Sequence, residues 1–496
     1  MERDLTREEM LSEPESKGSL GQHAMRGAFW SFLFSILNKV TTFASQIVLA
    51  WFLVPEDFGL IALATSITSL MSVISVGCLG DIIVQQKDDG QFKKDFGQIF
   101  WLCNSLNFVL VLLPMLASPW ISRAYHQPKL LPVLLLIEAN GLFVGLSLVY
   151  GCALKRSLKF KTLSVIFFVS GTIQSLVSIF MAWKGYGAYS IVVPIVLSSI
   201  VALLYQVYAA GFLPVGKPEP KLWLAYLAPS FWLLFLTILG ALQSQGTSFV
   251  MGFSQNTAQI GLYFWGFSLA NQIVFLICNN LRQVLFPTFA KLNGQSERQS
   301  DALRKSTRIM LIVIAYFCVI QAVTARPMIG LIFPARWLAA APVVSWISLG
   351  MLTQPLSILC FSMLMAKAQY RDVVINSIVQ GVLVVLCAMI GSLPAGSDSQ
   401  SAASWTALGF FLGGLFSGWQ MLTPFGHGLK VLAQILTKPL LLALACGLCG
   451  VLAVQAVQNQ NLYWQLGMGI LGVSAAYALA IRLFDMESYR ALRSRI

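Results

Sequence analysis

Charged residues are scarce in this sequence. Asp, Glu, Lys and Arg make up only 11% of the 496 residues, whereas soluble proteins carry roughly 25%. Hydrophobic residues make up 57%, and the mean hydropathy is +0.74. This composition excludes a soluble globular protein, and it leaves no basic soluble face for binding a nucleic acid. We therefore expect an all-α polytopic membrane protein.

Motifs for metal binding and ATP hydrolysis are also missing. His23, His126 and His427 lie far apart, without the spacing of metal ligands. No G-x-x-x-x-G-K-[ST] motif occurs, so a P-loop ATPase is excluded. Cys446 and Cys449 form a C-x-x-C pair, which is typical either of a redox or metal site or of small residues packed in a helix. The apolar surroundings, "LLALACGLCGVLA", favour packing. We expect no metal and no cofactor.

Long apolar segments predict about fourteen membrane-spanning helices, because each crossing needs about 20 apolar residues. The segments are 28–53, 58–86, 96–118, 130–153, 162–183, 188–212, 223–250, 258–285, 307–333, 338–366, 373–392, 402–424, 431–456 and 462–482. Residues 1–27 are polar and lack a signal-peptide pattern. The net charge of +13 comes mostly from Lys and Arg in alternate loops. By the positive-inside rule, both termini are expected in the cytoplasm.

Two short similarities suggest an internal repeat. Asp57–Leu60 ("DFGL") matches Gln259–Leu262 ("QIGL") at an offset of 202 residues, and Phe160-Lys161 matches Tyr370-Arg371 at an offset of 210. Equivalent positions in the span order predict two six-helix parallel repeats around a central cavity. The expected parts are a cytoplasmic tail (1–27), an N-lobe (28–212), a linker (213–222), a C-lobe (223–424) and an appended helix pair with the C-terminus (425–496).

Polar residues are concentrated on a few of the expected helices. Candidate cavity residues are Asn38, Lys39, Thr42 and Gln46 in the first span, Gln243 and Gln245 in the seventh, and Gln272, Asn279 and Arg282 in the eighth. Small polar residues at helical spacing are also typical of close helix packing. A lysine in mid-bilayer, however, costs about 2.5–3.5 kcal/mol on insertion scales. Lys39 should therefore face a wet cavity or a partner.

The chemistry of these residues indicates an anionic ligand that carries sugars. Lys and Arg bind phosphate, whereas amide and hydroxyl groups bind sugar hydroxyls. Acidic residues inside the expected spans are few: Glu138 and Asp81. Each is a candidate to carry a coupling proton, and each is equally compatible with a structural pair with a neighbouring base.

Several segments resemble one bacterial family. They are "FLVPEDFGLIALA", "LKRSLKFKTLSVI", "KGYGAYSIV", "IGLYFWGFSLA", "QVLFPTFAKL" and "RWLAAAPVVSWISL", which occur in order between about residues 25 and 385. They are similar to polysaccharide transporters of the multidrug/oligosaccharidyl-lipid/polysaccharide flippase superfamily. The resemblance implies two six-helix lobes around a cavity and export of undecaprenyl-diphosphate-linked oligosaccharides across the bacterial inner membrane. The family often has an acid in span seven, where this sequence has Thr247.

The leading hypothesis is therefore a lipid-linked oligosaccharide flippase for lipopolysaccharide, exopolysaccharide or capsule synthesis, and not an enzyme. Its expected partners are the lipid-linked substrate, membrane lipids and polysaccharide polymerase or assembly proteins, and we expect a monomer. One alternative is a cation-coupled antiporter of small molecules, which would favour an acidic cavity. Another is a polysaccharide polymerase or ligase, which resembles chains with a large external loop.

Overall fold

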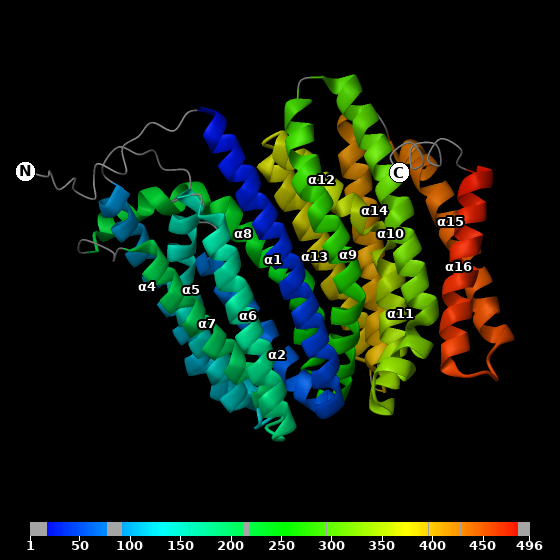
Figure 1. Ribbon diagram of the computed structural model, residues 1–496, viewed down its shortest axis with the longest axis horizontal. Coiled ribbons are helices and arrows are strands. Elements are labelled where there is room, and N and C mark those ends of the chain that lie inside the picture. The colour runs from blue at the N-terminus through cyan, green and yellow to red at the C-terminus, as the bar shows by residue number, and fades with distance from the viewer. Residues whose placement is uncertain are drawn as a thin grey trace, which may run out of the picture.

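The computed structural model describes residues 17–76, 92–157, 159–211, 218–293, 295–394, 396–425 and 428–484. Within these residues the chain forms helices and turns and no strand. The expected all-α fold is therefore confirmed. Figure 1 shows α4–α7 on one side of the molecule and α10–α14 on the other, with α1 running between them.

Six of the described helices correspond to the expected N-lobe (28–212), although the first begins at Lys17, within the expected tail. They are α1 (Lys17–Phe52), α2 (Pro55–Val76), α4 (Phe92–Ala124), α5 (Leu130–Arg156), α6 (Phe160–Trp183) and α7 (Tyr189–Ala210). Pro55 begins α2, where its fixed φ suits the first helical turn. Gly211 follows α7 with a φ of +73°, a left-handed conformation that glycine adopts without strain.

The range expected for the C-lobe contains a second set of helices. They are α8 (Pro220–Met251), α9 (Thr257–Lys291), α10 (Ser296–Ile332), α11 (Ala341–Gly350), α12 (Gln354–Ala366), α13 (Tyr370–Ser392) and α14 (Ser399–Leu422), with short 3-10 turns at Ala335–Ala340 (η2), Met351–Thr353 (η3) and Thr423–Phe425 (η4). The appended pair is α15 (Leu429–Ala456) and α16 (Leu462–Phe484). The side chains of Asn256 and Asp398 accept hydrogen bonds from the backbone N–H groups of Gln259 and Ser401 and so cap the N-termini of α9 and α14.

The span expected at 338–366 is not one continuous helix. The chain passes from η2 through α11 and η3 to α12. Pro355 lies in the first turn of α12, and its missing N–H interrupts the helical hydrogen bonds. At the break, a Cβ on Gly350 would lie 2.5 Å from the backbone of Ala407, so the bent segment packs directly on α14.

Eleven of the described helices are long and apolar enough to cross a membrane. The protein is therefore an integral membrane protein. Helices α2, α8 and α14 occupy the other three expected spans, but they are not among the eleven. The number of fourteen spans and the domain boundaries remain predictions.

The packing inside one half is repeated in the other. Helix α1 packs along α6, and α8 packs along α13. Likewise, α6 packs on α7 as α13 packs on α14, and α4 packs on α5 as α10 packs on α11. This pattern follows the order of the predicted repeat.

The two halves meet most tightly where α2 and α9 begin, which we call the closed end. A Cβ on Gly59 would lie 1.9 Å from the carbonyl oxygen of Thr257, and a Cβ on Gly261 would lie 1.8 Å from that of Pro55. The two contacts are related by the same offset of 202 residues that relates "DFGL" to "QIGL". Only glycine permits this approach of the backbones. The repeated glycines thus form a symmetric crossing of α2 over α9.

Candidate functional site: a cavity between the two halves

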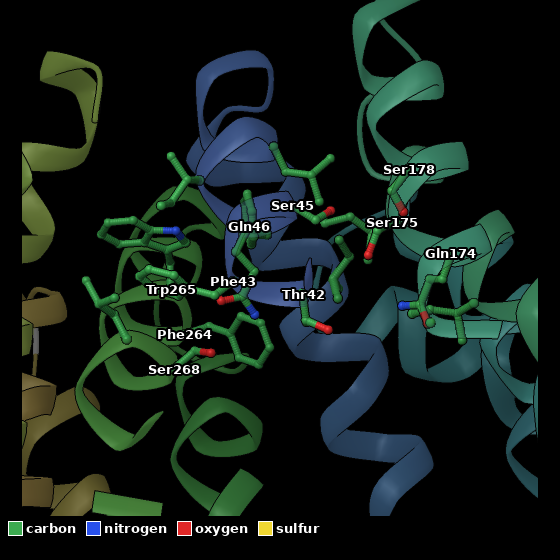
Figure 2. Close-up of a pocket in the computed structure, with 18 of the residues that line it drawn as sticks. Thr42, Phe43, Ser45, Gln46, Gln174, Ser175, Ser178, Phe264, Trp265 and Ser268 are labelled. Atoms are coloured by element: carbon green, nitrogen blue, oxygen red, sulfur yellow. The ribbon is translucent and has the colours of Figure 1, made fainter. Parts of the chain in front are cut away.

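A cavity of about 350 Å³ lies between α1, α2, α6, α7 and α9. Its polar lining consists of Asn38, Thr42, Ser45, Gln46, Thr65, Gln174, Ser175, Ser178 and Ser268, and its aromatic lining of Phe43, Phe58, Phe264, Trp265 and Phe333. Figure 2 shows the α9 side chains on one side and the α6 side chains on the other, with Thr42 and Gln46 of α1 between them. Both halves of the protein therefore contribute to one site.

Asn38, Thr42 and Gln46 lie on one face of α1 and line the cavity. The Asn38 Oδ1 atom is buried and has no hydrogen-bond partner among the described residues. It lies close to α6, where a Cβ on Gly171 would be only 2.3 Å away. Thr42 Oγ1 donates a hydrogen bond to the Asn38 carbonyl oxygen at 2.7 Å. The Thr42 hydroxyl is therefore presented to the cavity, whereas the Asn38 Oδ1 atom is enclosed against α6.

Gln272 is connected to the cavity by a hydrogen bond across the two halves. Its Nε2 atom donates to Gln46 Oε1 at 2.7 Å. Gln46 is on α1 and Gln272 is on α9, so the bond joins the N-lobe to the C-lobe. Two of the residues expected together from sequence are in direct contact here.

Lys39 and Arg282 do not line the cavity but lie farther from the closed end. Both side chains are exposed. Lys39 Nζ lies 5.7 Å from the centroid of the Phe275 ring on α9, and the Arg282 guanidinium lies 5.4 Å from that of Phe361 on α12. Cation–π contacts of this kind stabilise a charge modestly while leaving its N–H donors available. We call Lys39 and Arg282 the cation layer.

The candidate residues of α8 lie apart from this cavity. Gln243 Nε2 donates to Gln380 Oε1 of α13 at 2.6 Å, and the Gln245 Oε1 atom is buried without a described partner. Thr247, at the position of the family's acid, forms a contact of 3.3 Å between its hydroxyl and that of Thr406. The side chain of Asn279 and the whole of Asp81 lie outside the described residues.

Glu138 is buried inside the N-lobe and does not reach the cavity. It is 1% exposed on α5. Thr68 Oγ1 of α2 donates a hydrogen bond to its Oε1 atom at 2.8 Å. No salt bridge to Glu138 occurs among the described residues. Because α2 also forms the closed-end crossing, Glu138 is linked by one hydrogen bond to a helix that contacts both lobes.

A second set of contacts holds the halves together at the closed end. Trp337 Nε1 of η2 donates to the carbonyl oxygen of Ala50 at 2.8 Å, and Arg336 donates to those of Ala50 and Trp51. In return, Trp51 Nε1 donates to the carbonyl oxygen of Ile332 at 3.1 Å. The C-terminal carbonyl groups of α1 lack helical partners, so these donors satisfy them. We call this group the α1–η2 lock.

Aromatic rings continue the lock into the wall of the cavity. Trp337 is fully buried, and its ring centroid lies 4.6 Å from that of Trp265 and 5.2 Å from that of Phe58. Trp265 also meets Phe333 edge-on at 4.8 Å. The cavity therefore ends at an aromatic floor beneath the lock.

Sequence reasoning missed the contribution of α6. Gly171, Gln174, Ser175 and Ser178 line the cavity opposite α9. Their spacing of three and four residues, in "SGTIQSLVS", was a detectable signal of one polar helix face. This polar face contains no charged residue, so it resembles the small polar residues of ordinary helix packing.

The fold and its central cavity define an integral membrane protein with a transporter architecture. The structure of "Lipid II flippase MurJ, inward closed conformation" superposes with a TM-score of 0.71 at 14% identity, covering 93% of this chain and 99% of that one. An inward-facing multidrug resistance MATE family transporter of the MOP superfamily gives a TM-score of 0.62 at 12% identity, covering 78% of this chain and 94% of that one. These likenesses show the fold alone.

Residues 48–342 match the family described as "Polysaccharide biosynthesis protein", and the chain belongs to that family. Succinoglycan biosynthesis transport protein ExoT of Rhizobium meliloti (strain 1021) is 25% identical over 64% of this chain and 65% of its own length. Lipopolysaccharide biosynthesis protein WzxC of Escherichia coli (strain K12) is 22% identical over 79% of each chain. The predicted flippase superfamily and the prediction of a non-enzyme are confirmed.

Proposed function

We propose that this protein moves undecaprenyl-diphosphate-linked oligosaccharides across the bacterial inner membrane by alternating access. The observation that carries the proposal is a cavity with polar groups from both halves that is closed at one end, together with two exposed cations, Lys39 and Arg282, farther from that end. The relative ExoT is named a biosynthesis transport protein, which supports a transport activity for this protein as well. Rocking of the two lobes about the cavity would expose it to each side in turn.

The diphosphate would bind at the cation layer. Lys39 and Arg282 are exposed, so their N–H groups can meet phosphate oxygens in charge-assisted hydrogen bonds. The amides and hydroxyls of the cavity would hold the sugars. The polyprenyl tail would remain in the lipid beside α1 or α9. The extensive contact with α9 is made by α2 and not by α1, so the tail could pass between α1 and α9.

Orientation and coupling complete the proposal. The cation layer would face the cytoplasm with both termini, and the closed end would face outward. Reporter fusions at Lys161 and Lys221 should then report cytoplasm, and fusions at Asp57 and Asp398 should report the exterior. Glu138 is proposed to carry a coupling proton. Its hydrogen bond with Thr68 gives a route by which protonation would alter α2.

A cation-coupled antiporter is the rival function, because the MATE fold is shared. The chemistry of the cavity argues against it. A cavity for organic cations needs acidic groups, and none of the described residues that line this one is acidic. A polymerase or ligase is less favoured still, since the relatives bear transport and biosynthesis names and the sequence has no long external loop.

The Lys39→Ala variant tests the proposal in cells whose own copy of the gene is deleted. Loss of a phosphate ligand should abolish export and raise lipid-linked intermediates in the inner leaflet while protein levels stay normal. Lys39→Arg should retain partial export, because the charge remains but its shape changes. Lys184→Ala is the matched control, since Lys184 also lies over an aromatic ring, at 4.7 Å from the Trp183 centroid, but follows the C-terminal end of α6 and is not part of the cation layer. Full export by Lys39→Ala would refute the assignment.

A further inference from the structure

The cavity beyond the cation layer has a mostly apolar wall with several polar groups and no charge. Among its described lining residues none is Asp, Glu, Lys, Arg or His. Three amide side chains and several hydroxyl groups can form hydrogen bonds, and Phe43 and Phe264 provide flat aromatic faces. Small-molecule sites in proteins combine apolar walls with a few polar groups that orient the ligand, and the uncharged polar groups here match the hydroxyl groups of a neutral sugar.

We propose that this cavity is a subsite for an uncharged sugar, the one attached directly to the diphosphate, and that it excludes an acidic sugar there. This inference rests on the proposed function and deepens it. The hydroxyl groups of a hexose or N-acetylhexosamine would bond to Thr42, Gln174 and Ser175, while Phe43, whose side chain is exposed and lines the cavity, would cover an apolar face of the ring. The diphosphate would remain at the cation layer.

The exclusion of an acidic sugar follows from the positions of the charges. Along α1, Lys39 follows Asn38, at the end of the cavity nearer the cation layer, and precedes Gln46 by seven residues, about 10 Å of helix. On α9, Arg282 follows the lining residue Ser268 by fourteen residues, which is about 21 Å of helix. Lys161 and Lys184 lie at the two ends of α6, and Arg336, at the closed end, donates to the carbonyl oxygens of Ala50 and Trp51. None of these three cations lines the cavity. A carboxylate inside the cavity would lose its hydration without gaining a cationic partner.

The size of the cavity limits the subsite to the start of the oligosaccharide. About 350 Å³ is near the lower end of small-molecule sites, which range over about 300–1,000 Å³. This volume suits one sugar ring or two, and not a whole repeat unit. Sugars farther along the chain would lie outside the cavity, where the restriction on charge would not apply.

Calorimetric titration of the full-length protein in lipid nanodiscs tests the subsite. The probes are farnesyl diphosphate, farnesyl-diphospho-N-acetylglucosamine and farnesyl-diphospho-glucuronic acid. We expect the neutral sugar to tighten binding about tenfold over farnesyl diphosphate, equivalent to about 1.4 kcal/mol. Glucuronic acid should give no tightening.

Two variants locate the effect in the cavity. Thr42→Val and Ser175→Ala should each reduce the gain from the neutral sugar and leave the affinity for farnesyl diphosphate unchanged. Ser164→Ala is the control on the same helix as Ser175, because the Ser164 hydroxyl bonds only to the Phe160 carbonyl oxygen among the described contacts and does not line the cavity. It should preserve the full gain.

The outcomes separate this inference from the proposed function. No binding of any probe would overturn the proposed diphosphate site and the subsite with it. Equal affinities for farnesyl diphosphate and the neutral probe would overturn the subsite alone. Tightening by glucuronic acid equal to that by N-acetylglucosamine would overturn the exclusion of charge.

Discussion

Gly261→Ala should weaken the closed end. The new Cβ would lie 1.8 Å from the carbonyl oxygen of Pro55, about 1.6 Å short of ordinary contact at 3.4 Å. The neighbour is backbone and not the end of a flexible side chain, so α2 and α9 must move apart. Overpacking of this kind costs about 1–3 kcal/mol. Since 1.4 kcal/mol is a factor of ten, the ratio of closed to open molecules should fall roughly 5- to 150-fold.

Distances between spin labels in nanodiscs measure this ratio. Labels at Glu56→Cys and Gln400→Cys lie on exposed positions of α2 and α14. Cys449→Ser removes the exposed cysteine among the described residues, where the other seven are buried. Cys78→Ser removes the cysteine that lies outside the described residues. Gly261→Ala should add a longer distance that the parent protein lacks.

Two further glycine variants make the test decisive. Gly59→Ala should reproduce the effect through the related contact with Thr257, and Gly240→Ala should leave the distances unchanged, because a Cβ there meets nothing within 4 Å. Parent-like distances in both Gly59→Ala and Gly261→Ala would show that the crossing of α2 and α9 does not control closure.

Three more variants test other parts of the proposal. Trp337→Phe keeps a ring but leaves the Ala50 carbonyl without that donor; a loss of about 1–3 kcal/mol should again lengthen the spin-label distances, whereas unchanged distances would remove the α1–η2 lock from the mechanism. Glu138→Gln should slow transport in proteoliposomes and leave substrate affinity intact, and parent-like rates would assign Glu138 to structure. Burial in the closed conformation raises the pKa of Asp57 above its ordinary value, although hydrogen bonds from backbone N–H groups act in the opposite direction. The protonated carboxyl therefore favours the closed conformation, so closure should strengthen as pH falls through the raised pKa and weaken as pH rises through it. Asp57→Asn should abolish this pH dependence.

The sequence predicted the helical framework well because bilayer physics leaves strong signals. A helix in lipid must be long and apolar, and its flanking charges are biased to one side. The break between α11 and α12 was missed, since hydropathy does not detect the effect of Pro355 on the helical hydrogen bonds. The "DFGL" and "QIGL" repeat was detected, but the direct contact between the two turns required the fold.

The site was only partly predictable, because helix faces can be read from sequence but rotations between helices cannot. Spacing placed Asn38, Thr42 and Gln46 on one face, and the structure brings Gln272 to Gln46. The same reasoning grouped Gln243 with them, yet that amide bonds to Gln380 inside the C-lobe. A row of polar residues on α8 indicates only that they have some polar partner. Here the partner of Gln243 is on α13, a helix of the same lobe.

The lysine in the first span has a physical explanation in this arrangement. An intramembrane lysine needs water, a counter-charge or both. Lys39 is exposed and lies over Phe275, and no described salt bridge holds it, so it is not the buried half of an ion pair in the described structure. The available charges therefore differ along the site. Lys39 and Arg282 are exposed in the cation layer, the cavity is lined by neutral amides and hydroxyls, and Arg336 at the closed end is engaged by the carbonyl groups of Ala50 and Trp51. An anionic head group would be attracted to the cation layer. For that reason the diphosphate should bind at the cation layer while the first sugar lies in the cavity, and release on the other side would require the lobes to rock.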